Sequence, residues 1–228
     1  MTKNTFKSLP HEKKERLLET AAKLFAEKGF HQTDMAQIAA KAGVAKGSLY
    51  NYFDSKDDLY LEVCRHGLEK SRRAVYGGLD PEGDVYRQIE HIFRQGAPFA
   101  LAHPEYIRLY LNVSSAGMER FAEKLSREVE KYTADHLKKI LKDGLARGQV
   151  RPDLDVNAAA FTINGLYILF LVSLVSRHFQ VRMKEYLEIE GEFDRAAVEA
   201  ALERIIAVIS DYLRPVGAGD PGLDRGER

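Results

Sequence analysis

Apolar residues recur along most of the chain at intervals of three and four positions, which is the spacing of one face of an α-helix. Runs that alternate polar and apolar residues with β-branched side chains, the pattern of a half-buried strand, are not evident. Glycine, proline and acidic clusters separate the helical stretches. The pattern therefore predicts an all-α protein.

The first helix is predicted over residues 10–28. Gly29 suits the left-handed position that follows a helix, and Phe30 can then pack back on Phe25. These two features predict a defined end for this helix. Its apolar stripe consists of Leu17, Leu18, Ala21, Leu24 and Phe25.

Two short helices are predicted next, one on each side of a glycine turn. Thr33 is placed to cap the first of them, which ends at Gly43, and the second runs through Phe53. Ser55, with Asp58 three residues later, forms a capping box that opens a long fourth helix. Short helices joined by a tight turn indicate a helix-turn-helix, so the N-terminal part is predicted as a three-helix domain.

The segment GGLDPEGD at 77–84 predicts the first domain boundary. We expect an N-terminal domain over 1–76, which includes the start of the fourth helix, and a larger helical domain over 77–214. Residues 215–228, rich in glycine, are expected to be disordered. Helices are predicted in the second domain near 84–101, 104–116, 119–147, 155–178 and 194–214.

The most apolar segment, 165–175, is shorter than the roughly 20 residues that a membrane-spanning helix needs. It is predicted to be a core or interface helix, so no membrane partner is expected. The N-terminus lacks the apolar region of a secretory signal, and Cys64 is the single cysteine. A cytoplasmic protein without disulfides or a cysteine metal cluster is therefore expected.

The charge of the chain is distributed unevenly. Residues 1–74 carry 14 Lys and Arg against 10 Asp and Glu, whereas the remainder carries 20 against 24. Composition is otherwise ordinary for a globular protein, with 45% hydrophobic and 30% charged residues. The basic N-terminal part suits a polyanionic partner, although random surface variation explains the same offset.

On a helical wheel, Leu49 and Phe53 define the buried side of the third helix. Gly47, Ser48 and Asn51 face outward, and Tyr50 and Tyr52 flank them. Small residues allow close approach to a DNA major groove, and Ser and Asn can address base edges. Tyrosine hydroxyls and lysines can reach phosphates. The candidate DNA contacts are Thr33, Ala45, Lys46, Gly47, Ser48, Tyr50, Asn51, Tyr52 and Lys56.

The stretch TAAKLFAEKGFHQTDMAQIAAKAGVAKGSLYNYFDSKDDLYLEV, at 20–63, resembles the DNA-binding domain of the TetR (tetracycline repressor) family of bacterial transcriptional regulators. Its most specific pieces are LFAEKGF, IAAKAGVAKGSLYNYF and SKDDL. The resemblance implies that the positions of Thr33, Lys46, Gly47, Tyr50, Tyr52 and Lys56 touch DNA, mostly its backbone. Beyond residue 75 the resemblance is one of architecture.

The resemblance also implies a homodimer that binds palindromic operator DNA and in which the last two long helices of each subunit form a four-helix bundle. The wide apolar surfaces of the helices at 155–178 and 194–214 agree with this, although burial within a monomer is the alternative. The expected interface residues are Ala158, Gly165, Leu166, Leu202, Ile205 and Ile209.

The resemblance further implies a small effector bound between the middle helices, although core packing explains each apolar candidate singly. We expect an apolar or amphipathic effector, with acyl-CoA as one hypothesis, because basic groups lie next to the most apolar helix. The identity of the effector is not encoded in the sequence, and no other cofactor is expected. The candidates are Phe93, Phe99, Tyr106, Tyr110, Phe121, Phe161, Leu169, Arg177 and His178.

Two other classes of function were weighed. An enzyme would need a catalytic or metal constellation, yet Glu62 and His66 near Cys64 lack a third ligand at useful spacing, so no catalytic and no metal residues are expected. A helical interaction protein without DNA binding gives no reason to expose Lys46, Tyr50, Tyr52 and Lys56 together. The sequence thus favours a dimeric, ligand-responsive transcriptional regulator, with repression the expected mode.

Overall fold

The computed structural model describes residues 2–215, and within this range the chain forms α-helices and no strand, as predicted. The helices divide into a small N-terminal head, α1 to α4, and a longer body. Their bounds are α1 Asn4–Lys7, α2 His11–Gln32, α3 Met35–Ala42, α4 Lys46–Tyr52, α5 Lys56–Tyr76, α6 Val85–Ala102, α7 Pro104–Asn112, α8 Glu119–Ala146, α9 Val156–Val175, α10 Arg177–Leu187 and α11 Arg195–Leu213.

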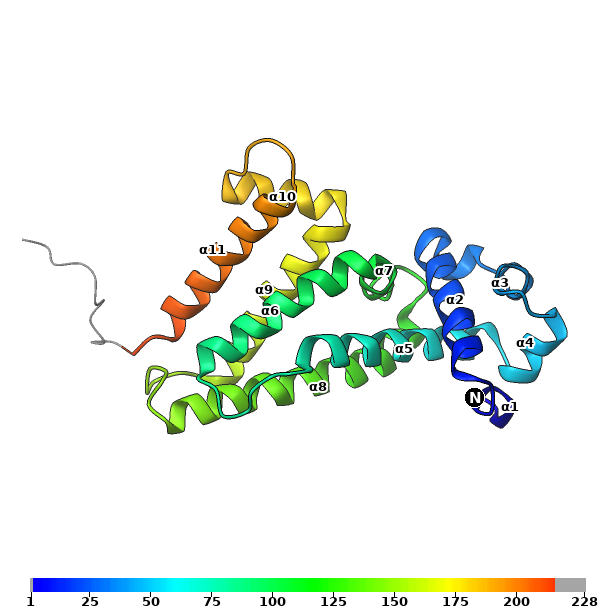
Figure 1. Ribbon diagram of the computed structural model, residues 1–228, viewed down its shortest axis with the longest axis horizontal. Coiled ribbons are helices and arrows are strands. Elements are labelled where there is room, and N and C mark those ends of the chain that lie inside the picture. Colours follow the sequence, from blue (N-terminus) through cyan, green and yellow to red (C-terminus); the bar gives the residue numbers. More distant parts are fainter. Residues whose placement is uncertain (1, 216–228) are drawn as a thin grey trace, which may run out of the picture.

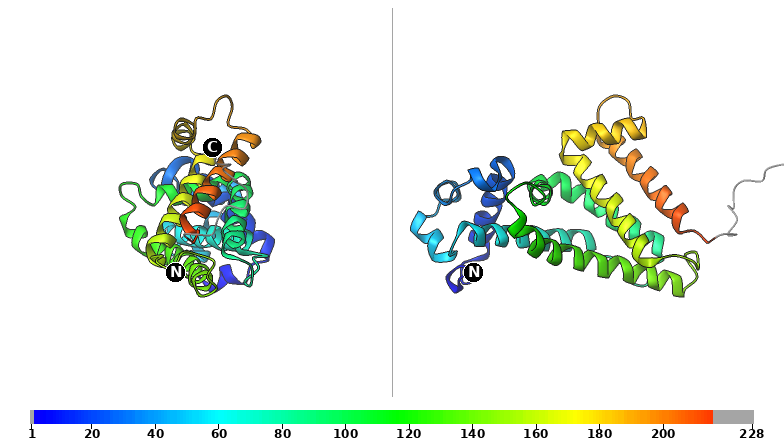
Figure 2. Two further views of the ribbon diagram at one scale, coloured as in Figure 1. Left: turned by 90° about the vertical axis from the view of Figure 1, so that its left-hand side faces the viewer. Right: turned by 180° about the vertical axis from the view of Figure 1, so that it is seen from behind.

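The molecule is elongated, with the head at one end (Figure 1). Helices α5 and α8 run along the body away from the head, and α6 and α9 lie beside them. Seen from behind, α9 and α11 rise from the body and α10 joins their upper ends (Figure 2). Helix α5 thus belongs to both parts, because it leaves the head and forms one wall of the body.

The core of the head includes side chains from the body. Phe30 of α2 packs against Tyr60 of α5 and Phe121 of α8, with ring centroids 5.2 and 5.0 Å away. Tyr60 and Phe121 also contact each other at 5.0 Å, and all three rings are buried. The predicted domain boundary at residue 77 lies in a loop. The hydrophobic core of the head nevertheless includes residues of α7 and α8, which come after this boundary in the chain.

The predicted helix ends are partly correct. Gly29 has a φ of 77°, and Phe25 and Phe30 stack with centroids 6.0 Å apart. The chain nevertheless resumes helical turns and reaches Gln32 rather than ending at residue 28. The predicted Ser55 cap of α5 is confirmed: the Asp58 amide donates to Ser55 Oγ at 3.1 Å, and this hydroxyl donates to the Asp58 carboxylate at 3.0 Å.

The predictions for the body were wrong in three places. The helix predicted over 155–178 is two helices, because the chain turns at Ser176, whose φ and ψ are −116° and 120°. The following helix, α10, was missed, since Met183 is its single buried residue and the rest of its sequence is mostly polar. The helix predicted over 104–116 ends at Asn112. The disorder prediction for 215–228 falls outside the described residues except at Pro215.

Helix α9 is longer than its apolar segment suggested. It has 20 residues and a mean hydropathy of 2.0, so by length and composition alone it could cross a membrane. The core helix of a soluble protein can have the same length and composition, so these two properties are weak evidence for a membrane span. Ala159, Ile163, Phe170 and Leu171 are buried in the body, in agreement with the predicted core role.

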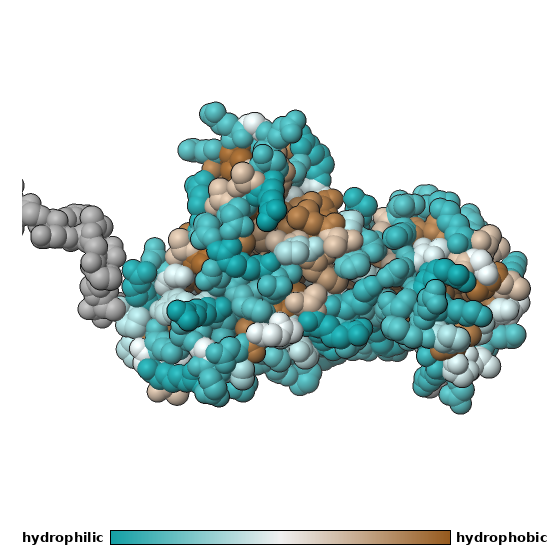
Figure 3. Space-filling model, in the orientation of Figure 1, coloured by the Kyte–Doolittle hydropathy of each residue, from teal (hydrophilic) through white to brown (hydrophobic). Residues whose placement is uncertain are grey.

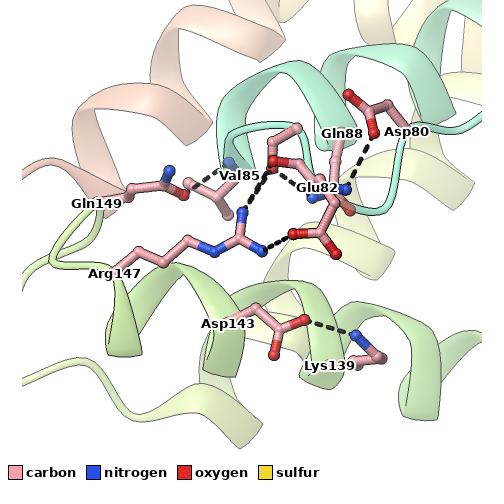
Figure 4. A network of polar contacts seen from close by, with 9 residues as sticks. Asp80, Glu82, Val85, Gln88, Lys139, Asp143, Arg147 and Gln149 are labelled. Atoms are coloured by element: carbon pink, nitrogen blue, oxygen red, sulfur yellow. Dashed lines mark hydrogen bonds and ion pairs between the residues drawn. The ribbon is translucent and has the colours of Figure 1, made fainter.

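The end of the body far from the head is held together by polar contacts between two loops (Figure 4). The Arg147 guanidinium, after α8, donates to the Glu82 carbonyl at 2.9 Å and pairs with the Glu82 carboxylate at 3.0 Å. The Gln149 side-chain oxygen accepts the first amide of α6, Val85, at 3.1 Å. These contacts fix the predicted boundary loop against α8.

The head and the body meet where α7 packs against α2 of the head and against α5. The Tyr106 ring of α7 lies so close to Gly67 of α5 that a Cβ at Gly67 would stand 2.2 Å from Tyr106 Cδ1. Beside this contact, Arg65 of α5 forms a two-pronged pair with Glu128 of α8, with N to O distances of 2.9 and 3.0 Å. Glycine at position 67 is therefore required by close helix packing.

We predict that Gly67→Ala lowers the free energy of unfolding by about 1–3 kcal/mol, because the buried Tyr106 ring must move to admit a methyl group. Urea unfolding measures the change. Gly47→Ala is the matched control, since a Cβ at Gly47 meets no atom within 4 Å. Equal stability of Gly67→Ala and the unaltered protein would contradict the packing described here.

Candidate nucleic-acid interface and ligand cavity

Helices α3 and α4 form the predicted helix-turn-helix. Asp34 caps α3, with its carboxylate accepting the Gln37 amide at 2.8 Å, and Gly43 ends the helix with a φ of 70°. Gly43 supplies the left-handed conformation that turns the chain into α4. Leu49 and Phe53 are fully buried against the rest of the head, so they fix which side of α4 faces outward.

The outward side of α4 carries the small and polar residues that the helical wheel placed there. Ala45, Lys46, Gly47 and Asn51 are exposed, Tyr50 is 45% exposed, and Ser48 and Tyr52 are half-buried. Packing within the protein does not require glycine at position 47, since space around it is open and its φ is not positive. A helix with such a face can enter a major groove closely, with hydroxyl and amide groups near base edges.

Two predicted DNA contacts are turned inward. Thr33 is fully buried, and its hydroxyl lies 2.8 Å from the Gly29 carbonyl oxygen, so Thr33 is not the cap of α3 as predicted. The Lys56 ammonium donates to the carbonyls of Phe30 at 2.8 Å and Thr33 at 2.9 Å. Both side chains bond the end of α2, because its last carbonyls need donors. Periodicity alone could not reveal these partners.

A cavity of about 190 Å³ lies between α5, α7, α8 and α9. Of the predicted ligand residues, Phe99, Tyr106 and Tyr110 line it. Its walls are mainly apolar, and besides the hydroxyls of Tyr106 and Tyr110 it has polar groups from residues that the sequence analysis missed. These include Ser71, Arg72, Tyr76, Ser126, Glu130, Tyr132, Thr133 and Asn164.

The other predicted ligand residues lie elsewhere. Phe93 is buried in the body core, and Phe121 belongs to the core of the head. Phe161 and Leu169 are 82% and 43% exposed on α9. Arg177 and His178 are exposed on α10 and do not line the cavity. As ligand contacts these residues stay predictions that this cavity does not include, because an apolar or basic residue in a helix does not reveal which neighbour it faces.

The cavity has one cationic and one acidic group. The Arg72 guanidinium stacks 3.9 Å from the centre of the Tyr132 ring and donates to the Glu128 carbonyl at 3.0 Å. Its Nε is buried and has no hydrogen-bond partner within the described part of the chain. An Arg donor in an apolar wall can recognise a carbonyl, carboxylate or phosphate oxygen.

The acidic group, Glu130, accepts hydrogen bonds from the Tyr110 hydroxyl at 3.1 Å and from the Asn164 amide at 3.3 Å. Burial, together with the neighbouring Glu130 charge, raises the pKa of Tyr110 to about 12. The tyrosine therefore remains a hydrogen-bond donor at neutral pH. Asn164 was a usable signal in the sequence, since it is an amide in the middle of the most apolar helix.

The expected dimer residues divide between two environments. Ala158 and Gly165 are exposed on α9, and Leu166 and Ile205 are half-buried. Leu202 and Ile209 are 2% exposed, because that side of α11 packs within the body, so they do not face outward as expected. The outward side of α9 is apolar, with Phe161 and Leu169 exposed. Another apolar area appears between α7 and the α10 end of the molecule (Figure 3).

We predict that Gly47→Ala raises the stability of the protein by up to about 1 kcal/mol and weakens its binding to DNA at least tenfold. Alanine is the better helix former, yet its methyl group occupies the surface that faces the groove. Urea unfolding and fluorescence anisotropy measure the two effects. Unchanged DNA affinity would contradict the orientation assigned to α4.

We predict that Cys64, which lines the cavity, reacts with thiol reagents far more slowly than a free cysteine at pH 8. Burial raises its pKa to about 12, so the reactive thiolate is scarce. Because Cys64 is the single cysteine in the chain, the labelling rate of the protein is the labelling rate of this residue. Labelling at the rate of an unfolded control would show that the cavity is open to water.

The comparisons with known proteins agree with this architecture. The family described as bacterial regulatory proteins of the tetR family matches residues 17–63. The transcriptional repressor KstR2 of Rhodococcus jostii (strain RHA1) is 34% identical over 153 residues, which are 63% of this chain and 70% of the repressor. The match therefore extends well beyond the helix-turn-helix.

Solved structures share the whole fold. A TetR family regulator from Chloroflexus aurantiacus J-10-FL has a TM-score of 0.68 and 24% identity, covering 94% of this chain and 99% of its own. FadR of Bacillus subtilis, solved in complex with stearoyl-CoA, has a TM-score of 0.69 and 17% identity, covering 88% and 99%. Together with the interface geometry, these findings establish that the chain belongs to the TetR family and is a DNA-binding transcriptional regulator.

Proposed function

We propose that the protein is a homodimeric cytoplasmic repressor that leaves a palindromic operator when a small amphipathic effector fills the cavity. The observation that carries this proposal is the position of Tyr106. Its ring lines the cavity and also packs against Gly67 of α5, the helix that leaves the head. An effector that displaces Tyr106 would therefore change the packing of the head on the body.

The contacts of α7 support this coupling. Helix α7 packs against α2 of the head and against α9 of the body. Three of its residues besides Tyr106 line the cavity, namely Ile107, Leu109 and Tyr110, and so does Val113, which follows the helix. An effector in the cavity can thus shift the equilibrium between two positions of the head. The size of this shift is set by the difference between the effector's affinities for the two positions.

The chemistry of the cavity favours an effector with an apolar body and one oxygen acceptor. Apolar side chains would hold the body, while Arg72 would donate to the acceptor. The present volume of about 190 Å³ is smaller than the roughly 300–1,000 Å³ of pockets for drug-sized ligands, so a long ligand must widen it or extend outside. An acyl thioester fits this description, with its acyl chain inside, and FadR of Bacillus subtilis was solved with such a ligand.

The proposed dimer uses the outward apolar side of α9, where Ala158, Phe161 and Gly165 are exposed. A two-fold operator requires a two-fold protein, and small residues allow two helices to approach closely. Val208, 61% exposed on α11, can extend the same contact. Leu202 and Ile209 would stabilise α11 within each protomer instead.

The proposal gives the protein no catalytic role. The Glu62 carboxylate accepts the Thr2 hydroxyl at 2.8 Å, and His66 Nε2 lies 3.5 Å from the Glu15 carboxylate. Burial lowers the pKa of His66, while Glu15 acts in the opposite direction. These contacts hold helices together. Within residues 2–215, His, Cys, Asp and Glu do not gather into a group that could hold a metal ion.

We predict that medium-chain or long-chain acyl-CoA releases the protein from its operator and that Arg72→Met weakens this response about tenfold, the scale of one charge-assisted hydrogen bond. The variant loses the donor and keeps the bulk of the side chain. Fluorescence anisotropy of an operator duplex, titrated with acyl-CoA of several chain lengths and with free fatty acids, measures the release.

Arg177→Met is the matched control, because Arg177 is exposed on α10, away from the cavity. It should respond like the unaltered protein. Native mass spectrometry of the purified protein reports the dimer and any ligand that remains bound. A response lost in Arg177→Met and kept in Arg72→Met would move the headgroup site to α10, and no response to any acyl compound would contradict this effector class.

A further inference from the structure

The end of α4 has an unusual source of hydrogen bonds. Helix α4 has seven residues. Its regular backbone hydrogen bonds end at the Leu49 carbonyl, which accepts the Phe53 amide at 3.0 Å. The next three carbonyls, those of Tyr50, Asn51 and Tyr52, belong to the final turn and need donors from elsewhere. All three receive them from residues 3–5 at the N-terminus.

Each bond comes from a different group. Lys3 Nζ donates to the Tyr50 carbonyl at 2.9 Å, and the Lys3 amide donates to the Tyr52 carbonyl at 3.0 Å. The Thr5 hydroxyl donates to the Asn51 carbonyl at 2.5 Å. A helix that lacks a left-handed glycine at its end is thus completed by a segment about 46 residues away in the sequence.

A buried aromatic contact holds this segment in place. Phe6 is 3% exposed, and its ring lies 4.8 Å from that of Phe53 and 6.1 Å from that of Tyr52. Thr2 pairs with Phe53 in a β-bridge, and its hydroxyl donates to Glu62 of α5. The segment therefore ties the end of α4 to the helix that connects the head with the cavity.

The physical need for such a cap follows from the length of α4. An isolated helix of fewer than about 12–15 residues is marginal in water, so the last turn of α4 depends on contacts from outside. The Lys3 ammonium also lies at the negative end of the helix dipole, and Asp54 holds it from the other side at 2.8 Å. The capped turn carries Tyr50 and Asn51, which face the proposed groove.

We propose that residues 2–6 form the C-terminal cap of α4 and position its DNA-reading side, so that Lys3, Thr5 and Phe6 are positioning residues for operator binding. This proposal rests on the assignment of α4 as the DNA-reading helix. The competing explanation is that the lysines at this end of the chain bind phosphate directly, for example Lys7, which follows the segment and has an exposed side chain.

Thr5→Val separates the two explanations, because it removes the hydroxyl with no change of charge and little change of volume. Phe6→Ala, which detaches the segment, is the second variant. Lys7→Met is the matched control: it removes a charge from the same segment and leaves the three bonds to α4 intact. Hydrogen exchange of the α4 amides is measured without DNA, and operator affinity is measured at several salt concentrations on a duplex selected by the full-length protein.

We expect Thr5→Val to speed exchange at residues 49–53 and to weaken operator binding about three- to tenfold, the scale of one hydrogen bond. The slope of log affinity against log salt should stay unchanged. Phe6→Ala should show the same pattern more strongly. Lys7→Met should leave exchange unchanged, and any loss of affinity should come with a slope shallower by about 0.9, the value for one phosphate contact.

Unchanged exchange at residues 49–53 in Thr5→Val and Phe6→Ala would overturn the cap. Faster exchange with unaltered operator affinity would overturn its positioning role. Exchange that rises equally throughout α2 and α3 would show general destabilisation and would also overturn the proposal. Failure of the unaltered protein to bind any duplex would contradict DNA reading by α4, whereas the exchange result would still decide whether the cap exists.

Discussion

The packing of Phe30, Tyr60 and Phe121 is the contact on which the rest of the structure depends. These rings come from α2, α5 and α8, so the head cannot complete its core without the body. Aromatic side chains remove a large apolar area from water, which makes separation of the two parts costly. The direction of the outward side of α4 is consequently set by the body as well as by the head.

Helix α4 is held from three directions as a result. Leu49 and Phe53 anchor it to the core of the head, the glycine turn at Gly43 sets its angle to α3, and the N-terminal segment completes its last turn. Each contact fixes a different degree of freedom. A short helix with weak intrinsic stability thereby presents a single face, which is what reading base edges requires.

The cavity also depends on a side chain that makes more than one contact. Tyr106 lines it and also packs against Gly67 of α5, so one side chain belongs both to the cavity wall and to the contact between α5 and α7. The polar groups of the cavity come from three helices: Arg72 from α5, Glu130 from α8 and Asn164 from α9. Their convergence depends on how the helices are arranged in space, which explains why a residue-by-residue analysis did not find the set.

The sequence by itself determined the local features: helix periodicity, the turn at Gly43, the cap at Ser55 and the buried side of α4. Each of these depends on residues within a few positions of one another. Only the tertiary structure decided that Thr33 and Lys56 bond the end of α2, that Leu202 and Ile209 pack inside the protomer, and that residues 3–5 cap α4. Periodicity gives each helix an apolar face, yet the neighbour that covers this face is chosen by packing between distant segments.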